Sequence, residues 1–126
     1  MDLRLSSLEF RADYKLHIFK QKAFSMIIVI VTFKISSDIT ESILKEKFME
    51  SSSLYKDTPG LIRKHYLSDV KNNTAGGVYC FDTFKNAQNW FDAERIDWLT
   101  QRYSKPEIKF YDNPIVIDNI SQEIIS

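Results

Sequence analysis

The stretch MIIVIVTF, residues 26–33, is apolar or threonine at every position and determines how the rest of the chain is arranged. It is too short to span a bilayer, and the acidic residues upstream, with no small-residue cleavage site downstream, do not fit a signal peptide. A short apolar run of this kind is typical of a strand buried on both faces in the middle of a sheet. Other parts of the protein must therefore pack against both faces of this strand.

A helix and a β-hairpin follow this strand along the chain. Residues 36–52 place apolar side chains at helical spacing, and Asp38 with Glu41 fits a capping pair at the start of that helix. The turn DTPG then stops the helix, because proline fixes its φ and glycine admits a left-handed backbone. Two strand-like runs, 61–70 and 75–82, are joined by the polar KNNT and predict an antiparallel hairpin.

The C-terminal half completes the pattern. Residues 83–103 predict either two consecutive helices or one kinked helix, since the apolar stripe shifts at residues 92–94. Residues 107–119 indicate an edge strand with a bulge or bend at Pro114, because proline cannot donate to a central ladder. The order βαββαβ predicts an α+β fold, the ferredoxin-like sandwich, with helices on one face of a four-stranded antiparallel sheet.

The chain of 126 residues suits one domain, which we expect to cover residues 26–119. Residues 1–25 are an N-terminal extension of uncertain structure and residues 120–126 a C-terminal tail; the sequence leaves open whether the physiological start is at residue 26. Gly76 and Gly77 begin the third strand, which is central in this fold. Glycine weakens a strand unless something must come close. We expect the N-terminal extension or a partner subunit's final strand to pass over them.

Composition and charge limit the partners of this domain. Basic and acidic residues balance at 17 each, so no net field attracts nucleic acid or an acidic membrane surface. The single cysteine, Cys80, permits no intramolecular disulfide and favours a reducing, cytoplasmic location. Because the first strand is apolar on both faces but helices cover only one, the uncovered face predicts a homodimer. We expect neither nucleic acid nor membrane as a partner.

Three phrases of the sequence carry a family resemblance: PGLIRKHYL at 59–67, AGGVYCFD at 75–82 and PEIKFYDNPIVIDN at 106–119. With the order of elements, they resemble the YdhR-type mono-oxygenase family of the dimeric α/β-barrel superfamily, over about residues 26–119. The resemblance implies a homodimer whose two sheets form a barrel, with a pocket between sheet and helices in each subunit. It also implies kinship with cofactor-free oxygenases that oxidise aromatic polyketides to quinones.

Two residues are candidates for the proton transfer that a cofactor-free oxygenation requires. An imidazole changes charge near neutral pH, so His65 could take a proton from a phenolic substrate. A histidine that hydrogen-bonds within a dimer interface, or to water, fits the same pattern. Tyr79 is the second candidate, as a base or a hydrogen-bonding group. His65 and its neighbour Tyr66 must lie on opposite faces of their strand. The aromatic residues that could enclose a small aromatic ligand, or form ordinary core, are Tyr66, Phe81, Trp90, Trp98 and Tyr103.

No cofactor or metal is expected. Asp92, Glu94 and Asp97 have no histidine nearby and fit a solvated helix face, and the charges of Arg63 and Lys64 fit a strand end that faces water. These observations, with the resemblance, predict a cofactor-independent mono-oxygenase acting on a small aromatic or phenolic compound. Two alternatives stay open: a non-catalytic dimeric protein that binds a small molecule, and an isomerase or haem-degrading enzyme of the same barrel superfamily.

Overall fold

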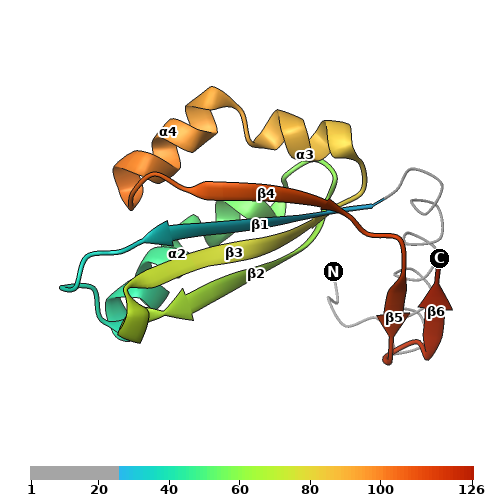
Figure 1. Cartoon of the computed structure of the whole chain (residues 1–126), viewed down its shortest axis with the longest axis horizontal. Helices are drawn as coiled ribbons and strands as arrows, with labels where there is room; N and C mark the ends of the chain where they lie inside the picture. Colours follow the sequence, from blue (N-terminus) through green and yellow to red (C-terminus); the bar gives the residue numbers. More distant parts are fainter. Residues whose placement is uncertain (1–25) are drawn as a thin grey trace.

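The computed structural model describes residues 26–126; the predicted N-terminal extension, residues 1–25, lies outside the described residues. Figure 1 shows the strands of one sheet running side by side, with helices packed against it. In chain order the elements are β1 (Ile27–Lys34), α2 (Glu41–Lys56), β2 (Leu61–Asp69), the 3-10 helix η2 (Val70–Asn72), β3 (Thr74–Phe81), α3 (Phe84–Trp90), α4 (Ala93–Arg102), β4 (Glu107–Asp112), β5 (Val116–Asp118) and β6 (Glu123–Ile125). The predicted order βαββαβ is therefore confirmed through β4.

The main sheet is antiparallel throughout, with strand order β2-β3-β1-β4. β1 and β3 lie at its centre, which confirms the predicted place of both strands. Side chains alternate between the faces of a strand, so Val29, Val31 and Phe81 share the face toward the helices, where each is 0% exposed. Ile28 and Ile30 lie on the other face and are only half-buried. We call this second face the open face.

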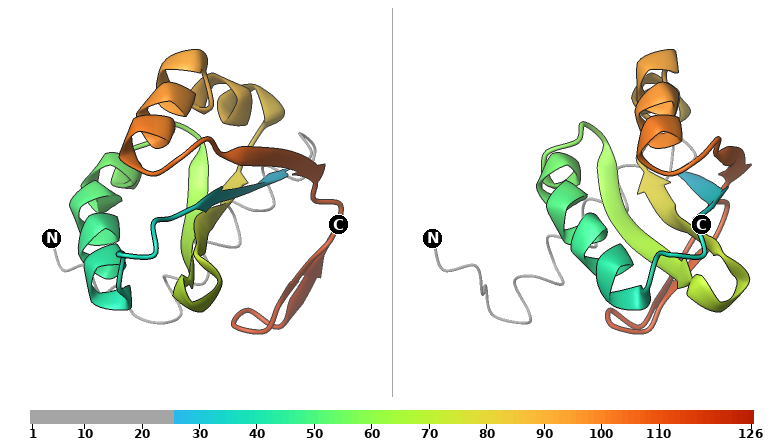
Figure 2. Two further views of the ribbon diagram at one scale, coloured as in Figure 1. Left: turned by 60° about the vertical axis from the view of Figure 1, so that its left-hand side comes forward. Right: turned by 90° about the vertical axis from the view of Figure 1, so that its left-hand side faces the viewer.

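The helices lie against one face of the sheet, as the two views in Figure 2 show. Thr40 caps α2 by accepting a hydrogen bond from the backbone N–H of Ile43. The predicted capping pair of Asp38 and Glu41 is wrong, because Asp38 lies in the turn before the helix and Thr40 has the extended backbone of a cap. Asp92 caps α4, which confirms the alternative of two consecutive helices. Within the described part of the chain, no helix has the length and apolarity needed to cross a membrane.

Gly76 and Gly77 both have close neighbours in the adjoining strands of the sheet. A Cβ at Gly76 would collide with the carbonyl oxygen of Val31 in the paired strand β1. A Cβ at Gly77 would stand 3.2 Å from Lys64 Cε and 3.2 Å from Tyr79 Cε1. Within residues 26–126, these neighbours account for the absence of a side chain at both positions. The predicted passage of the N-terminal extension falls outside the described residues, and that of a partner's final strand stays a prediction.

The chain leaves the main sheet after β4 and forms a separate hairpin. The N–H of Asn113 donates to the carbonyl of Met26 at 2.9 Å as the chain turns, and β5 then pairs with β6. The predicted edge strand is thus β4 alone, and residues 120–126, expected as a tail, contain β6. Figure 2 shows the hairpin on the opposite side of the sheet from α2. Its contacts with the main sheet join Ile125 and Val116 to Met26, Ile62 and Cys80.

Candidate active site at a tyrosine cage

The amino group of Lys64 lies among three tyrosine rings between the sheet and α2. Its Nζ is 3.2 Å from the ring centroid of Tyr55, 3.8 Å from that of Tyr66 and 4.7 Å from that of Tyr79. We call these three tyrosines the tyrosine cage. The faces of aromatic rings carry negative partial charge and attract cations. The cage can therefore stabilise a positive charge on the nitrogen that it surrounds.

Strand alternation and a glycine bring the cage together. Lys64 and Tyr66 are two residues apart on β2 and share its helix-facing side, opposite Tyr79 and Gly77 of β3. Because Gly77 has no side chain, the stem of Lys64 occupies the space beside it. Tyr55 comes from the last turn of α2, which packs on β2.

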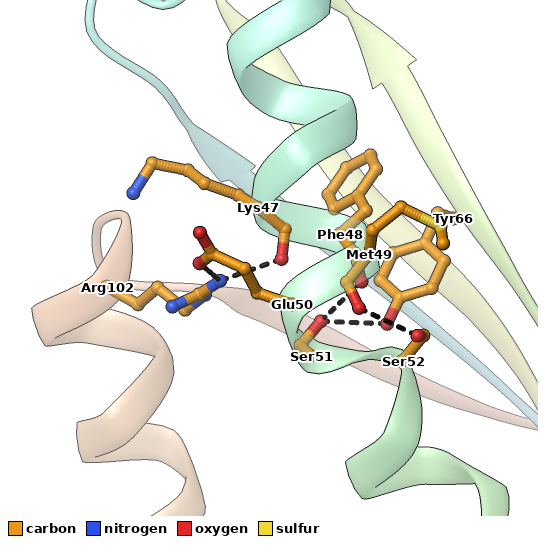
Figure 3. Close-up of polar contacts among 8 residues, drawn as sticks. All are labelled: Lys47, Phe48, Met49, Glu50, Ser51, Ser52, Tyr66 and Arg102. Carbon is orange, nitrogen blue, oxygen red and sulfur yellow. Dashed lines mark hydrogen bonds and ion pairs between the residues drawn. The ribbon is translucent and has the colours of Figure 1, made fainter.

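Tyr66 is held in place by the middle of α2. Its hydroxyl oxygen is 2.8 Å from that of Ser51, and the Ser51 hydroxyl donates to the carbonyl of Phe48 at 3.1 Å (Figure 3). Since Ser51 has one proton and uses it on that carbonyl, Tyr66 is the donor in the shared bond. The Phe48 ring also stacks on the Tyr66 ring, with 4.4 Å between centroids. These contacts fix one wall of the cage.

Arg102 ties the end of α4 to α2 beside the cage. Its Nη2 donates to the carbonyl of Lys47 at 2.7 Å and pairs with the Glu50 carboxylate at 3.0 Å (Figure 3). Its guanidinium carbon lies 5.5 Å from the ring centroid of Trp98 and 5.6 Å from that of Tyr103. Arg102 thus links α4 to α2 next to the cage.

Burial acts in opposite directions on the acidic and basic groups here. It raises the pKa of each cage tyrosine above its ordinary value, and that of Tyr79 strongly. It lowers the pKa of Lys64 to about 6, because the charged amine loses its hydration, and no carboxylate among residues 26–126 pairs with it. The ring faces oppose part of this fall. The site therefore combines protonated phenols, which can donate hydrogen bonds, with an amine that burial shifts toward its neutral form, which can accept a proton.

Lys64 lies where an inner cavity meets an outer groove. The cavity, of about 10 Å³, holds at most a water molecule. The groove, of about 300 Å³, runs along the edge strand β2 and the end of α2, and its volume reaches the range of small-molecule sites. An aromatic ligand therefore fits the groove and not the cavity. The groove is lined by Ser52, Tyr55, Lys56, Leu61, Ile62, Arg63, Lys64 and Tyr66.

The structure brings some of the predicted ligand-binding residues together and separates others. Trp90 packs against Tyr55, with 5.4 Å between ring centroids, and Phe81 is a fully buried core residue. In the groove, Tyr66 is the predicted residue that a ligand would meet. The predicted residues that line the inner cavity are Tyr66, Tyr79, Trp98 and Tyr103.

His65 lies on the open face, away from the cage. It is exposed and lines a separate cavity of about 240 Å³ that also includes Cys80 and the hairpin residue Val116. The predicted opposite orientation of His65 and Tyr66 is confirmed, since Tyr66 packs under α2. Burial raises the pKa of the Cys80 thiol. The two predicted catalytic residues, His65 and Tyr79, therefore belong to different faces and different cavities.

The predicted acidic cluster on α4 and its N-terminus is a helix surface. Asp92, Glu94 and Asp97 are all exposed, and Asp92 accepts from the backbone N–H of Arg95 at 2.8 Å. Among residues 26–126, no three His, Cys, Asp or Glu side chains are grouped to hold a metal ion. Asp92 thus caps the start of α4, and Glu94 and Asp97 belong to its exposed surface.

Lys64 is the site residue that sequence reasoning missed, since the expectation that it faces water is wrong. The sequence does indicate that Lys64 and Tyr66 share one face of β2, because they are two residues apart. Gly77 on the neighbouring strand β3 leaves space beside them. The position of Tyr55 beside Lys64 depends on how α2 packs on β2, and the local sequence pattern does not predict this packing. The buried amine follows from that packing.

Most of the described chain matches the sequence pattern of a known protein family. A family model described as "Putative mono-oxygenase ydhR" matches residues 28–112, which is more than half of the chain. The chain belongs to this family. The resemblance inferred from sequence phrases is thus confirmed, and so is mono-oxygenase kinship at the level of the family's description.

Solved structures share the fold of this YdhR-family chain. SnoaB, a cofactor-independent oxygenase from Streptomyces nogalater solved in a mutant form, superposes with a TM-score of 0.57 at 11% identity, over 75% of this chain and 99% of its own. NE2512, of unknown function from Nitrosomonas europaea, gives 0.57 at 14% identity, over 71% and 90%. A conserved protein of unknown function from Bacteroides thetaiotaomicron gives 0.53 at 13% identity, over 71% and 99%. No curated protein sequence matches the chain.

Proposed function

We propose that this YdhR-family chain is a cofactor-independent mono-oxygenase that binds a small phenolic compound in the groove over Lys64. The observation that carries the proposal is the amino group of Lys64, held among the rings of the tyrosine cage beside that groove, where burial lowers its pKa to about 6. The family description supports mono-oxygenation in general. SnoaB, which has the same fold, is described as a cofactor-independent oxygenase.

Removal of a proton from the substrate is the first step that these residues support. An amine whose pKa lies near the working pH is an effective general base toward a phenol. When Lys64 takes the phenolic proton, the ammonium that forms lies against the ring faces of the cage. The cage therefore stabilises the charge that the proton transfer creates, and the ammonium in turn stabilises the phenolate beside it.

The deprotonated substrate is electron-rich and would react with dioxygen as a carbanion. If a ring methylene is oxidised to a carbonyl, one oxygen atom enters the product. The second oxygen atom leaves as water with the two methylene hydrogens. This balance needs no external reductant, which fits an enzyme that works on phenols activated by proton removal alone.

Tyr79 has a supporting role in this proposal. Burial holds its hydroxyl protonated, and the hydroxyl donates to that of Tyr55 at 3.4 Å. This bond orients the Tyr55 ring, the ring nearest to Lys64 Nζ. His65 stands on the open face and takes no part in the step, so it provides a matched control.

We also propose that the open face pairs with the same face of a second copy of the chain. Ile28, Ile30 and Val78 of the two central strands are only half-buried there. Leu67 and Tyr111 on the flanking strands are 37% and 48% exposed. Burial of this apolar surface against an identical surface stabilises a twofold dimer.

Oxygen uptake tests the proposed reaction. Metal-stripped full-length protein is mixed with anthrone-type and naphthol-type phenols, and the wild type is compared with Lys64→Met and with His65→Gln as the control. We expect Lys64→Met to be at least about 100-fold slower, the range that loss of a general base produces, and His65→Gln to be unchanged. The wild-type rate should rise as pH passes about 6, because the neutral fraction of the amine increases.

Two results would contradict the proposal. Equal rates for the wild type and Lys64→Met exclude Lys64 as the base. Binding of the phenols with no oxygen uptake across the panel supports the alternative of a non-catalytic binding protein.

A further inference from the structure

Lys64 is half-buried and borders the solvent-filled groove, whereas Tyr55 and Tyr79 of the cage are buried. It lines both the outer groove, of about 300 Å³, and the inner cavity. β2 is an edge strand, so the groove opens at the side of the sheet and needs no separation of strands. A ligand carbonyl group can approach the nitrogen from the groove while the cage rings lie around it.

The state of this amine suits nucleophilic attack. A protonated lysine has no free electron pair, and exposed lysines are almost wholly protonated at pH 7. Desolvation is a known route to an activated lysine, and burial here lowers the pKa of Lys64 to about 6. The groups that face the amine are the three cage tyrosines, with Lys56 and Arg63 on the groove walls.

The cage also favours the product of that attack. A protonated imine keeps its positive charge on the same nitrogen, which stays 3.2 Å and 3.8 Å from the centroids of the two nearest rings if the stem does not move. Ring faces stabilise such a cation at short range. The same rings also provide flat apolar contacts for an aromatic group attached to the carbonyl carbon.

We propose that Lys64 is an amine nucleophile that forms an imine with small aromatic aldehydes bound in the groove. The nitrogen attacks the carbonyl carbon to give a carbinolamine, and loss of water breaks the carbon–oxygen bond as the carbon–nitrogen double bond forms. No oxidant or reductant takes part. This activity goes beyond the proposed oxygenation, because it needs no dioxygen and no proton abstraction from the ligand.

Reductive trapping under nitrogen tests the proposal. Full-length protein is incubated at pH 7 with 4-hydroxybenzaldehyde and cyanoborohydride, which reduces an imine to a stable secondary amine, and peptide mass spectrometry locates the label. Lys56 is the internal control, because it lines the same groove but is exposed. We expect Lys64 to be labelled about 100-fold faster than Lys56, and Lys64→Met to lose only that label.

The wild-type protein alone can overturn the proposal, so it does not depend on how the variant folds. Labelling of Lys64 at the rate of Lys56, or slower, excludes an activated nucleophile. Because the trapping is done without oxygen, its failure leaves the oxygenase proposal standing, and loss of oxygen uptake does not affect the labelling result.

Discussion

Lys64 is subject to two opposing effects whose sizes decide its charge. Each aromatic ring face close to a cation stabilises it by about 0.5–2 kcal/mol. Burial lowers the pKa of Lys64 from 10.5 to about 6, and each unit of such a shift corresponds to about 1.4 kcal/mol. The loss of hydration, about 6 kcal/mol for this shift, therefore outweighs any one ring face, and the pKa of Lys64 stays below its ordinary value.

Replacement of Lys64 by methionine should make stability less dependent on pH. The folded pKa of about 6 lies below the unfolded value of 10.5, so between these values the unfolded chain binds more protons at this residue. The wild-type free energy of unfolding should therefore rise with pH from about 6 to 9, by up to about 1.4 kcal/mol per unit. Lys64→Met lacks this rise and should be more stable at pH 7 by about 1–3 kcal/mol.

Urea unfolding at several pH values between 6 and 9 measures this difference, with Lys56→Met as the exposed control. A difference between the wild type and Lys64→Met that stays constant over this range would show that Lys64 is charged in the folded protein.

The two glycines of β3 should respond differently to alanine. At Gly76 the new methyl group meets a backbone oxygen of the adjoining strand, Val31, which cannot move without opening the sheet. At Gly77 the neighbours are the backbone oxygen of His65 and the side chains of Lys64 and Tyr79, all 3.2 Å away, so a shift of a few tenths of an ångström makes room. We expect Gly76→Ala to cost about 3 kcal/mol and Gly77→Ala about 1 kcal/mol of unfolding free energy. Thermal unfolding of the pair measures this, and equal losses would contradict the assignment of their neighbours.

At the scale of elements, one side chain joins the helices that enclose the site. Arg102 of α4 donates to a backbone carbonyl of α2, whereas its ionic partner Glu50 is 60% exposed at the side chain. A charged donor to a carbonyl is worth about 1.5–3 kcal/mol, and an exposed ion pair less than about 1 kcal/mol. Arg102→Met should therefore lower the unfolding free energy by about 2 kcal/mol and Glu50→Gln by under about 1 kcal/mol. Similar losses in chemical denaturation would assign the link to the ion pair.

The sequence predicts the four-stranded sheet and its helices because their patterns are local. The continuous apolar run at residues 26–33 identifies β1, and the shifted stripe at residues 92–94 identifies the division between α3 and α4. The sequence does not predict the β5–β6 hairpin. Pro114 is compatible both with a bend within one edge strand and with a chain that leaves the sheet. The burial of the Lys64 amine is not predicted either, because it depends on a helix from another part of the chain.

At the scale of the whole molecule, the proposed groove and the proposed dimer surface lie apart. The groove follows the helix-facing edge of β2, and the dimer surface is the open face. Each subunit therefore carries the cage residues of its own site. Loss of the dimer should leave the reactivity of Lys64 in place.

Ile30→Asp tests the dimer, because it places a charge at the centre of the open face. We expect the wild type to have twice the mass of a single chain in light scattering at micromolar concentration, and Ile30→Asp to have the single-chain mass. Met49→Asp is the control, since Met49 is 66% exposed on α2, away from that face. A wild-type protein of single-chain mass would contradict the proposed dimer.

The missing side chain at residue 77 has a consequence for how the chemistry of this fold can diversify. The space beside that glycine lets the end of Lys64 turn inward, 3.2 Å from where a Cβ would lie. A larger residue there would push the amine toward water and return it to an ordinary charged lysine. A change that touches no ligand and carries no functional group could thus switch the reactive amine off.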